Sequence, residues 1–440
     1  MSAMDGLQGN VLAEYGSPHA VYVFATVADG AAARGWLAAR LDRITTHRGW
    51  QAAPSGVTLN LAFSHAGLLA LGVPEIRVAH LEAFCAGMAT RAEQLGDVGP
   101  SDPALWAKGL RENDLLIVLT ASEQGTREQA GLELLDSLGD GGLLAVHQQY
   151  THPREEGREH FGFQDGFSQP AVAGAATGPR VGEGTLTRWR RWRPLALGEF
   201  VLGNRDEGGR LPPAPLGPLG DGATFMVVRK LAQDVAGFRR YTEAAATRLD
   251  RDPAWLAAKM VGRWQNGSSL ARYPDGPGPA AAVDRKASHF SYAADPGGIA
   301  CPRGAHVRRA NPRDGLGWQG RLTQRHRIIR RGMGYGAPLA AGSTVDDGHE
   351  RGLIFVAYQA ALERQFEFVQ SQWLGDGNAL GLGADRDPIL APEGSSGEMV
   401  IQGRPPVFLT GLPRFVTTRG GGYYLLPGIA GLRALAAGAC

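Results

Sequence analysis

The chain has 440 residues, of which 43% are hydrophobic, and its 45 Lys and Arg against 43 Asp and Glu leave a formal net charge of only +2. This composition can bury the cores of two or three domains, and so small a net charge excludes a general attraction to nucleic acid or to an anionic membrane. The three cysteines, Cys85, Cys301 and Cys440, form no paired pattern, which excludes a disulfide framework and a cysteine-rich zinc site.

The N-terminus and the apolar runs give no sign of export or membrane insertion. Residues 1–6 carry neither a basic nor an apolar stretch, and no apolar run approaches the roughly 18 residues that a membrane span needs. We therefore expect a cytoplasmic protein with no membrane partner. The one dense basic run, residues 188–193, stands on a nearly neutral chain, so we expect no nucleic-acid partner.

The first half of the chain predicts alternating strands and helices. Strand-like apolar runs lie at residues 20–27, 57–63, 115–119 and 143–150. Helical spacing of apolar residues is found at 31–41, at 68–95 with a break near Pro74, and at 127–138. The order β-α-β followed by β-α-β is the split pattern of a ferredoxin-like α+β unit.

The second half repeats this logic loosely after a stretch rich in Gly, Pro and charge. That stretch, residues 203–222, predicts a linker between domains at 1–205 and 206–440. Beyond it, strands are expected at 224–228, 325–330, 352–359 and 423–426. Helices are expected at 231–249, 254–261 and 361–373.

One short segment presents a carboxylate between glycines. Residues 162–166 read Gly-Phe-Gln-Asp-Gly, with Asp165 near the end. Glycines allow a backbone to turn sharply and to approach a flat ring closely. An Asp-Gly pair alone is also a common turn, so the motif is weak without its neighbours.

A second segment presents one histidine among arginines. Residues 301–313 contain His306, followed by Arg308, Arg309 and Arg313. Neutral imidazole is a good iron ligand, and guanidinium groups bind carboxylates well. A surface histidine in an arginine-rich loop is the competing interpretation. Together the two segments suit an iron porphyrin with two acidic tails.

Peroxide chemistry on such a porphyrin requires three protein groups. These are an axial ligand below the iron, an acid/base above it, and a positive or polar group that stabilises charge as the O–O bond breaks. Histidine, aspartate and arginine are suited to these tasks.

Extended to residues 159–170 and 304–312, the two segments resemble the signatures of the dye-decolorizing peroxidase family. The similarity runs from residues 6–10 through 198–200 and 370–373 to 419–424, and is closest to the larger subgroup without an export signal. The resemblance implies an α+β fold of two ferredoxin-like domains, of the dimeric α+β barrel type, with haem b in the second domain. It also implies a peroxidase that reduces hydrogen peroxide and oxidises aromatic, phenolic or dye-like donors.

The resemblance implies a role for each catalytic residue. His306 would be the axial iron ligand, and Asp165 would be the distal acid/base, with Gly162 and Gly166 beside the macrocycle. Arg330 would stabilise the peroxide anion, since guanidinium is planar and always charged.

The strand expected at residues 325–330 distinguishes Arg330 from its neighbour Arg331. Side chains alternate along a strand, so only one of the two can face the pocket. On such a strand Arg330 would share its face with Ile328 and His326.

Further residues are expected around the cofactor. Leu353 and Phe355 are two apart on an expected strand, so they project to one side; the family segment lines the distal pocket, and ordinary core is the competing interpretation. Arg309 and Arg313 would reach the porphyrin propionates.

An axial histidine usually donates its second ring N–H to a carboxylate or carbonyl. Glu367 is the first candidate for this partner of His306. Asp385, Asp387 and a backbone carbonyl remain open as alternatives.

Two functions of other classes remain open. The chain could be a haem carrier or sensor with incidental peroxidase activity, or an interaction protein without haem. Having both Asp165 and Arg330 favours catalysis, because binding alone needs neither. The oligomeric state, monomer or dimer, stays undetermined.

Overall fold

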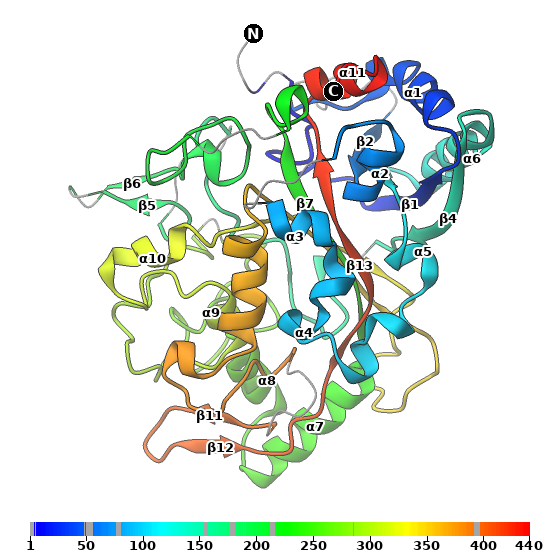
Figure 1. Ribbon diagram of the computed structural model, residues 1–440. Helices are drawn as coiled ribbons and strands as arrows, with labels where there is room; N and C mark the ends of the chain where they lie inside the picture. The colour runs from blue at the N-terminus through cyan, green and yellow to red at the C-terminus, as the bar shows by residue number, and fades with distance from the viewer. Residues whose placement is uncertain are drawn as a thin grey trace.

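The computed structural model (Figure 1) describes residues 4, 6–47, 49, 56–75, 81–153, 157–175, 181–187, 189, 191–211, 216–284, 286–390 and 397–440. Within these residues one antiparallel sheet of nine strands organises the chain, in the order β4-β1-β3-β2-β13-β7-β10-β8, with β9 also paired to β10. The sheet does not close into a barrel.

Each half of the sheet repeats one strand order. In the N-terminal half, the first, second, third and fourth strands are β1 (His19–Val27), β2 (Val57–Phe63), β3 (Leu115–Ala121) and β4 (Leu143–Tyr150). They lie in the order 4-1-3-2 across the sheet. This is the ferredoxin-like arrangement that the β-α-β repeats predict.

The C-terminal half follows the same order, with the short β8 and β9 in the second place. Its strands are β7 (Thr224–Gln233), β8 (Ile329–Arg330), β9 (Met333–Tyr335), β10 (Gly352–Gln359) and β13 (Val416–Leu426). The halves meet where Leu425 of β13 pairs with Phe63 of β2. The expected α+β fold is confirmed.

Helices alternate with the strands along the chain, and several of them pack on the sheet. The longer ones are α1 (Gly30–Ala38), α6 (Gln124–Asp140), α7 (Val235–Arg248), α8 (Pro253–Val261) and α11 (Ile429–Ala436). The shorter ones are α2 (His65–Ala70), α3 (Glu82–Ala86), α4 (Ala92–Leu95), α5 (Lys108–Arg111), α9 (His306–Ala310) and α10 (Arg321–Gln324). Two small hairpins, β5–β6 (Thr185–Leu186, Trp192–Arg193) and β11–β12 (Met399–Ile401, Val407–Leu409), lie apart from the sheet.

Alternation along the strands divides the sheet between two cores. Val21 and Leu119 point toward a core that includes Trp36 of α1 and Leu432 of α11. Residues of opposite parity from both halves share a second core, which Tyr22, Val118, Met226, Val356 and Tyr424 help to fill. One strand therefore stabilises two layers at once.

Several expected bounds are wrong. Residues 231–233 continue β7, and the helix that follows begins at Val235, where Asp234 caps it by accepting from the Gly237 amide. Of the strand expected at 325–330 only Ile329 and Arg330 form a strand, because α10 ends at Gln324 and a turn follows at residues 325 and 326. His326 and Ile328 therefore share no strand face with Arg330.

Two other segments differ in kind from the expectation. Residues 363–374 form a wide helix in which amides bond to carbonyls five residues back, as from Glu367 to Leu362. The expected linker is packed rather than loose, since Leu216 and Leu219 are buried. Parts of three segments discussed above lie outside the described residues. They are 212–215 of the linker, 76–80 of the expected helix 68–95, and 188 and 190 of the basic run.

No helix in the part of the chain that the structure describes is long and apolar enough to cross a membrane.

The seam between the two halves gives a stability prediction. Leu425 is fully buried where β13 joins β2 and β7. Leu425→Ala should lower the free energy of unfolding by about 2–5 kcal/mol, because it leaves a cavity in the core. Urea denaturation measures this. Phe408→Ala, at a side chain that is 66% exposed, should change it by less than about 0.5 kcal/mol, and equal losses in the two variants would contradict the assignment.

Candidate active site

Arg330 is fixed by the edge of the sheet. It lies opposite Ala357 in the β8–β10 pair, so its side chain shares a sheet face with Phe355 and Leu353. These two are half-buried, whereas Ile354 between them is buried in the second core. Arg331 turns to the other side and donates to the carbonyl of Asn10 at 3.2 Å. The choice of Arg330 over Arg331 is consistent with this geometry.

A loop carrying Asp165 docks on Arg330. The Gln169 side chain accepts from the Arg330 amide at 3.0 Å and donates to the Arg330 carbonyl at 3.1 Å. The guanidinium Nη2 donates to the carbonyl of Phe167 at 2.8 Å, and Nη1 lies 3.9 Å from Oδ1 of Asp165. The two side chains remain 39% and 31% exposed, so an acid and a cation stand together at an accessible surface.

The glycines of this loop are needed for its path. Gly162 and Gly166 have φ of +96° and +90°, a region that residues with a Cβ seldom enter. At Gly162 a Cβ would also lie 2.9 Å from Nε2 of Gln265. The amide of Gly166 donates to Oδ1 of Asp165 at 2.7 Å, which orients the carboxyl.

A buried carboxyl, Glu159, lies beneath the same loop. Its two oxygens accept from the amides of Phe161 and Phe163 at 2.9 Å each, and from Nε2 of Gln233 at 2.7 Å. Burial raises the pKa of Glu159, and the charge of Asp165 raises it further, against these hydrogen bonds. Glu159 thus ties the loop to the end of β7. Glu159 begins the 159–170 segment, but no role was predicted for it from the sequence.

His306 opens α9 and is held by Asp387. Its Nδ1 lies 2.8 Å from Oδ2 of Asp387, whose side chain is fully buried. The other Asp387 oxygen accepts from the amides of Ile389 and Leu390. Burial alone would lower the pKa of His306, but the Asp387 carboxylate outweighs it and raises that pKa, while the same contact lowers the pKa of Asp387.

The imidazole of His306 keeps an accessible surface: 29% of its side chain is exposed, although burial is the strongest single influence on its pKa. The charge of Arg330 also lowers that pKa, so the two groups lie within electrostatic reach. Asp165 lies beside the same guanidinium.

The partner expected for His306, Glu367, is wrong. Glu367 instead accepts from Arg91, with Nη2 to Oε2 at 2.6 Å, and from the hydroxyl of Tyr423 at 2.8 Å. It lies on the wide helix 363–374, which passes beside α9 but turns this carboxylate toward α4 and β13. Asp387, one of the alternatives left open, takes the place instead.

Arg309 is held by backbone carbonyls. It is fully buried, and its three nitrogens donate to the carbonyls of Gly304, Trp373 and Asp385. Such a side chain fastens α9 to the wide helix, and these three bonds use three of its five N–H donors. Its contact with a propionate stays a prediction.

Arg313 lies nearer to the Asp165 loop. Its Nη2 donates to the hydroxyl of Ser168 at 3.1 Å, and its Nη1 donates to the carbonyls of Ser288 and Phe290. Its contact with a propionate stays a prediction.

Two further arginines stand beside it without having been predicted. Arg263 donates to Ser168 at 2.7 Å, and Arg327 has a terminal nitrogen, Nη2, with no hydrogen-bond partner in the described structure. Burial lowers the pKa of Arg263 and of Arg327 to about 10; neighbouring guanidinium charges contribute to the shift, and the Glu183 carboxylate opposes it at Arg327. Several buried guanidinium groups close together favour an anionic group nearby. Because arginine is abundant throughout the sequence, these two residues did not stand out in it.

In the described residues no group of three or more His, Cys, Asp and Glu side chains could hold a metal ion by itself.

Comparisons with known proteins match the sequence and the fold. Two family models match: the DyP dimeric alpha+beta barrel domain over residues 6–148, and the C-terminal Dyp-type peroxidase model over residues 259–381. A dye-decolorizing peroxidase of Mycena epipterygia is 30% identical, over 99% of this chain and 87% of that protein.

Solved structures match equally far. An ancestral D-type dye-decolorizing peroxidase has a TM-score of 0.84 at 29% identity, covering 98% of each chain. A dye-decolorizing peroxidase in complex with 2,6-dimethoxyphenol has a TM-score of 0.84 at 26% identity, covering 99% of this chain and 100% of that one.

The buried carboxyl beneath the loop gives a pH prediction. Because the folded-state pKa of Glu159 is raised, its proton stabilises the fold fully below about pH 4.3, the unfolded value, and this stabilisation is lost as pH rises through the folded pKa. Relative to Glu159→Gln, the wild type should lose stability as pH rises above about 4.3, as measured by urea unfolding at each pH. The exposed control Glu243→Gln should show no such trend, and a pH-independent difference for Glu159→Gln would count against the burial argument.

Proposed function

Because the chain belongs to the dye-decolorizing peroxidase family, we propose that it is a haem b peroxidase that reduces hydrogen peroxide and oxidises small aromatic or phenolic donors. One observation supports the proposal: Asp165 stands beside Arg330, the charge of Arg330 acts on the imidazole of His306, and Asp387 holds that imidazole. The family is haem-dependent, so the question for this chain is which residues would hold the cofactor.

The residues present fit a haem. Asp387 engages Nδ1 of His306, so the lone pair of Nε2 would be available to the iron. Arg263, Arg313 and Arg327 are buried guanidinium groups within electrostatic reach of one another, with Glu183 beside Arg313 and Arg327. Nη2 of Arg327, which has no hydrogen-bond partner in the described structure, could bind a propionate. His306 would hold the iron, and these arginines would hold the acidic edge.

When bound, the haem supplies the electrons that reduce peroxide. The carboxylate of Asp165 would take the proton from one peroxide oxygen and return it to the other, which leaves as water. Arg330, 3.9 Å away, would hold the peroxide anion in between and stabilise the charge that moves onto the leaving oxygen.

Other side chains would limit access to this chemistry. Leu353 and Phe355 share the face of Arg330 and present apolar surface there. Apolar bulk beside the reacting oxygens would exclude water and large molecules. The relative solved with 2,6-dimethoxyphenol supports a small phenol as donor for this chain also.

A haem carrier or sensor would need only the His306 side of the site. The distal carboxylate and guanidinium are accessible and oriented by Gly166 and Phe167. Partial burial of a carboxylate and a guanidinium costs solvation free energy, and haem binding alone requires neither group. The arrangement therefore favours catalysis over storage.

The distal pair gives the test of function. In stopped-flow spectroscopy of the haem-loaded protein with hydrogen peroxide, Asp165→Asn should slow the reaction about 10²- to 10⁴-fold, because the proton carrier is lost. Arg330→Leu should slow it about 10²- to 10³-fold through loss of charge stabilisation.

Arg331→Leu is the matched control, since it removes an adjacent guanidinium from the opposite face and should retain the wild-type rate. If both distal variants react as fast as the wild type, the protein is a carrier or sensor.

The proximal side gives a second test. Asp387→Asn should weaken haem binding about 10- to 100-fold, because the imidazole loses the partner that fixes its orientation and basicity. Haem titration followed by absorbance measures this. The exposed control Asp346→Asn should bind as the wild type does, and unchanged affinity in Asp387→Asn would remove His306 from the iron site.

A further inference from the structure

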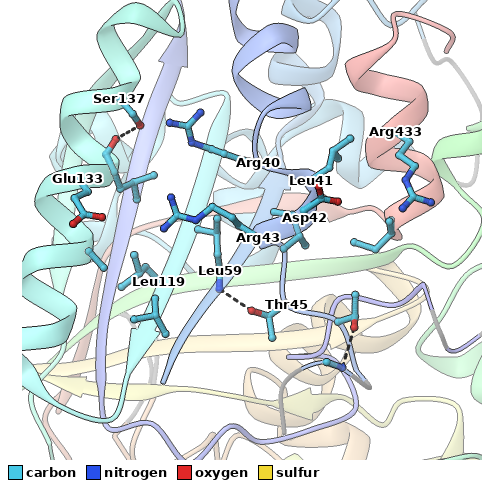
Figure 2. A pocket seen from close by; sticks show the side chains of 17 residues that line it. Arg40, Leu41, Asp42, Arg43, Thr45, Leu59, Leu119, Glu133, Ser137 and Arg433 are labelled. Atoms are coloured by element: carbon cyan, nitrogen blue, oxygen red, sulfur yellow. Dashed lines mark hydrogen bonds between the residues drawn. The ribbon is translucent and has the colours of Figure 1, made fainter. Parts of the chain in front are cut away.

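A cavity of about 500 Å³ lies in the N-terminal half, away from the site described above. It is enclosed by the turn η1 (Leu41–Arg43), α6, α11 and the strands β2 and β3. Figure 2 shows Arg40 and Arg43 at its centre, between Glu133 and Ser137 of α6 and Arg433 of α11. Its lining includes none of His306, Asp165 and Arg330.

The floor of this cavity is apolar. Leu59 and Leu119, from neighbouring strands, and Leu134 of α6 are each less than 10% exposed and belong to the first core. Ala130 adds a small side chain on α6 that leaves space above the strands. A flat or chain-like hydrocarbon would bury its surface here, and the volume falls in the range of small-molecule sites.

The rim of the cavity is positively charged. Three arginines, Arg40, Arg43 and Arg433, stand against two carboxylates, Asp42 and Glu133. Arg40 is already engaged, because it donates to the carbonyl of Trp36 and lies 4.3 Å above that ring.

Arg43 and Arg433 are exposed, and neither side chain forms a hydrogen bond or an ion pair in the described structure. Burial and then the like charge of Arg43 lower the pKa of Arg40. An anion between these arginines would relieve that repulsion.

We propose that this cavity binds a small organic anion with an apolar body, of the class of aromatic carboxylates. The carboxylate would pair with Arg43 and Arg433, and the ring would cover Leu59 and Leu119. An inorganic anion would leave the apolar floor uncovered, and a neutral ring would leave the guanidinium groups unpaired.

The test measures binding of 2-naphthoate to the full-length, haem-loaded protein by isothermal titration calorimetry. The double variant Arg43→Gln/Arg433→Gln should bind it at least about tenfold more weakly, because two charge-assisted contacts are lost. Ala130→Phe, which fills the cavity and keeps every charge, should abolish binding. Neutral 2-naphthamide and inorganic phosphate should each bind the parent at least about tenfold more weakly than 2-naphthoate.

A matched control is Arg210→Gln/Arg321→Gln, which removes two exposed arginines elsewhere and should leave the affinity unchanged. Thermal unfolding of each variant shows that the fold is retained. Equal affinity of the parent and Arg43→Gln/Arg433→Gln would overturn the proposal, as would equal binding of 2-naphthamide or of phosphate. Because no cavity residue belongs to the peroxide site, this result is independent of the proposed function.

Discussion

The pairing of Arg330 with both the sheet and the Gln169 side chain is the contact on which the site depends. β10 fixes which way the guanidinium points, and Gln169 bonds to both the amide and the carbonyl of the same residue. The loop that carries Asp165 is thereby fastened to a strand edge rather than left to its many glycines. A loop otherwise costly in conformational entropy is placed where an acid and a cation can act together.

The proximal side is built on the same physical rule, with a buried carboxylate in place of a strand. Asp387 is held by two backbone amides and in turn holds Nδ1 of His306. These hydrogen bonds compensate the buried negative charge of Asp387 and so reduce the free-energy cost of its burial. Both sides thus consist of a reactive group, a polar partner and a rigid element that supports the partner.

Contacts between residues far apart in the sequence could not be predicted from local patterns. His306, Asp165 and Arg330 were proposed from the residue types of their own segments, and their roles stay predictions. Strand alternation predicted that Arg330 and Arg331 face opposite sides, which agrees with the structure. Glu367 was misassigned because its partners, Arg91 and Tyr423, lie far away in the sequence. Arg263 and Arg327 did not stand out because arginine is abundant in the sequence. The α+β order could be predicted from strand periodicity, but β8, with only two residues, is too short to show a periodicity.

Whether His306 binds the haem iron is tested most directly by the iron–histidine stretching band in the resonance Raman spectrum of the ferrous, haem-loaded protein. We expect this band in the wild type, its loss in His306→Ala, and its return when imidazole is added to that variant. A band that persists unchanged in His306→Ala without imidazole would mean that another residue holds the iron, and the site as described would be wrong.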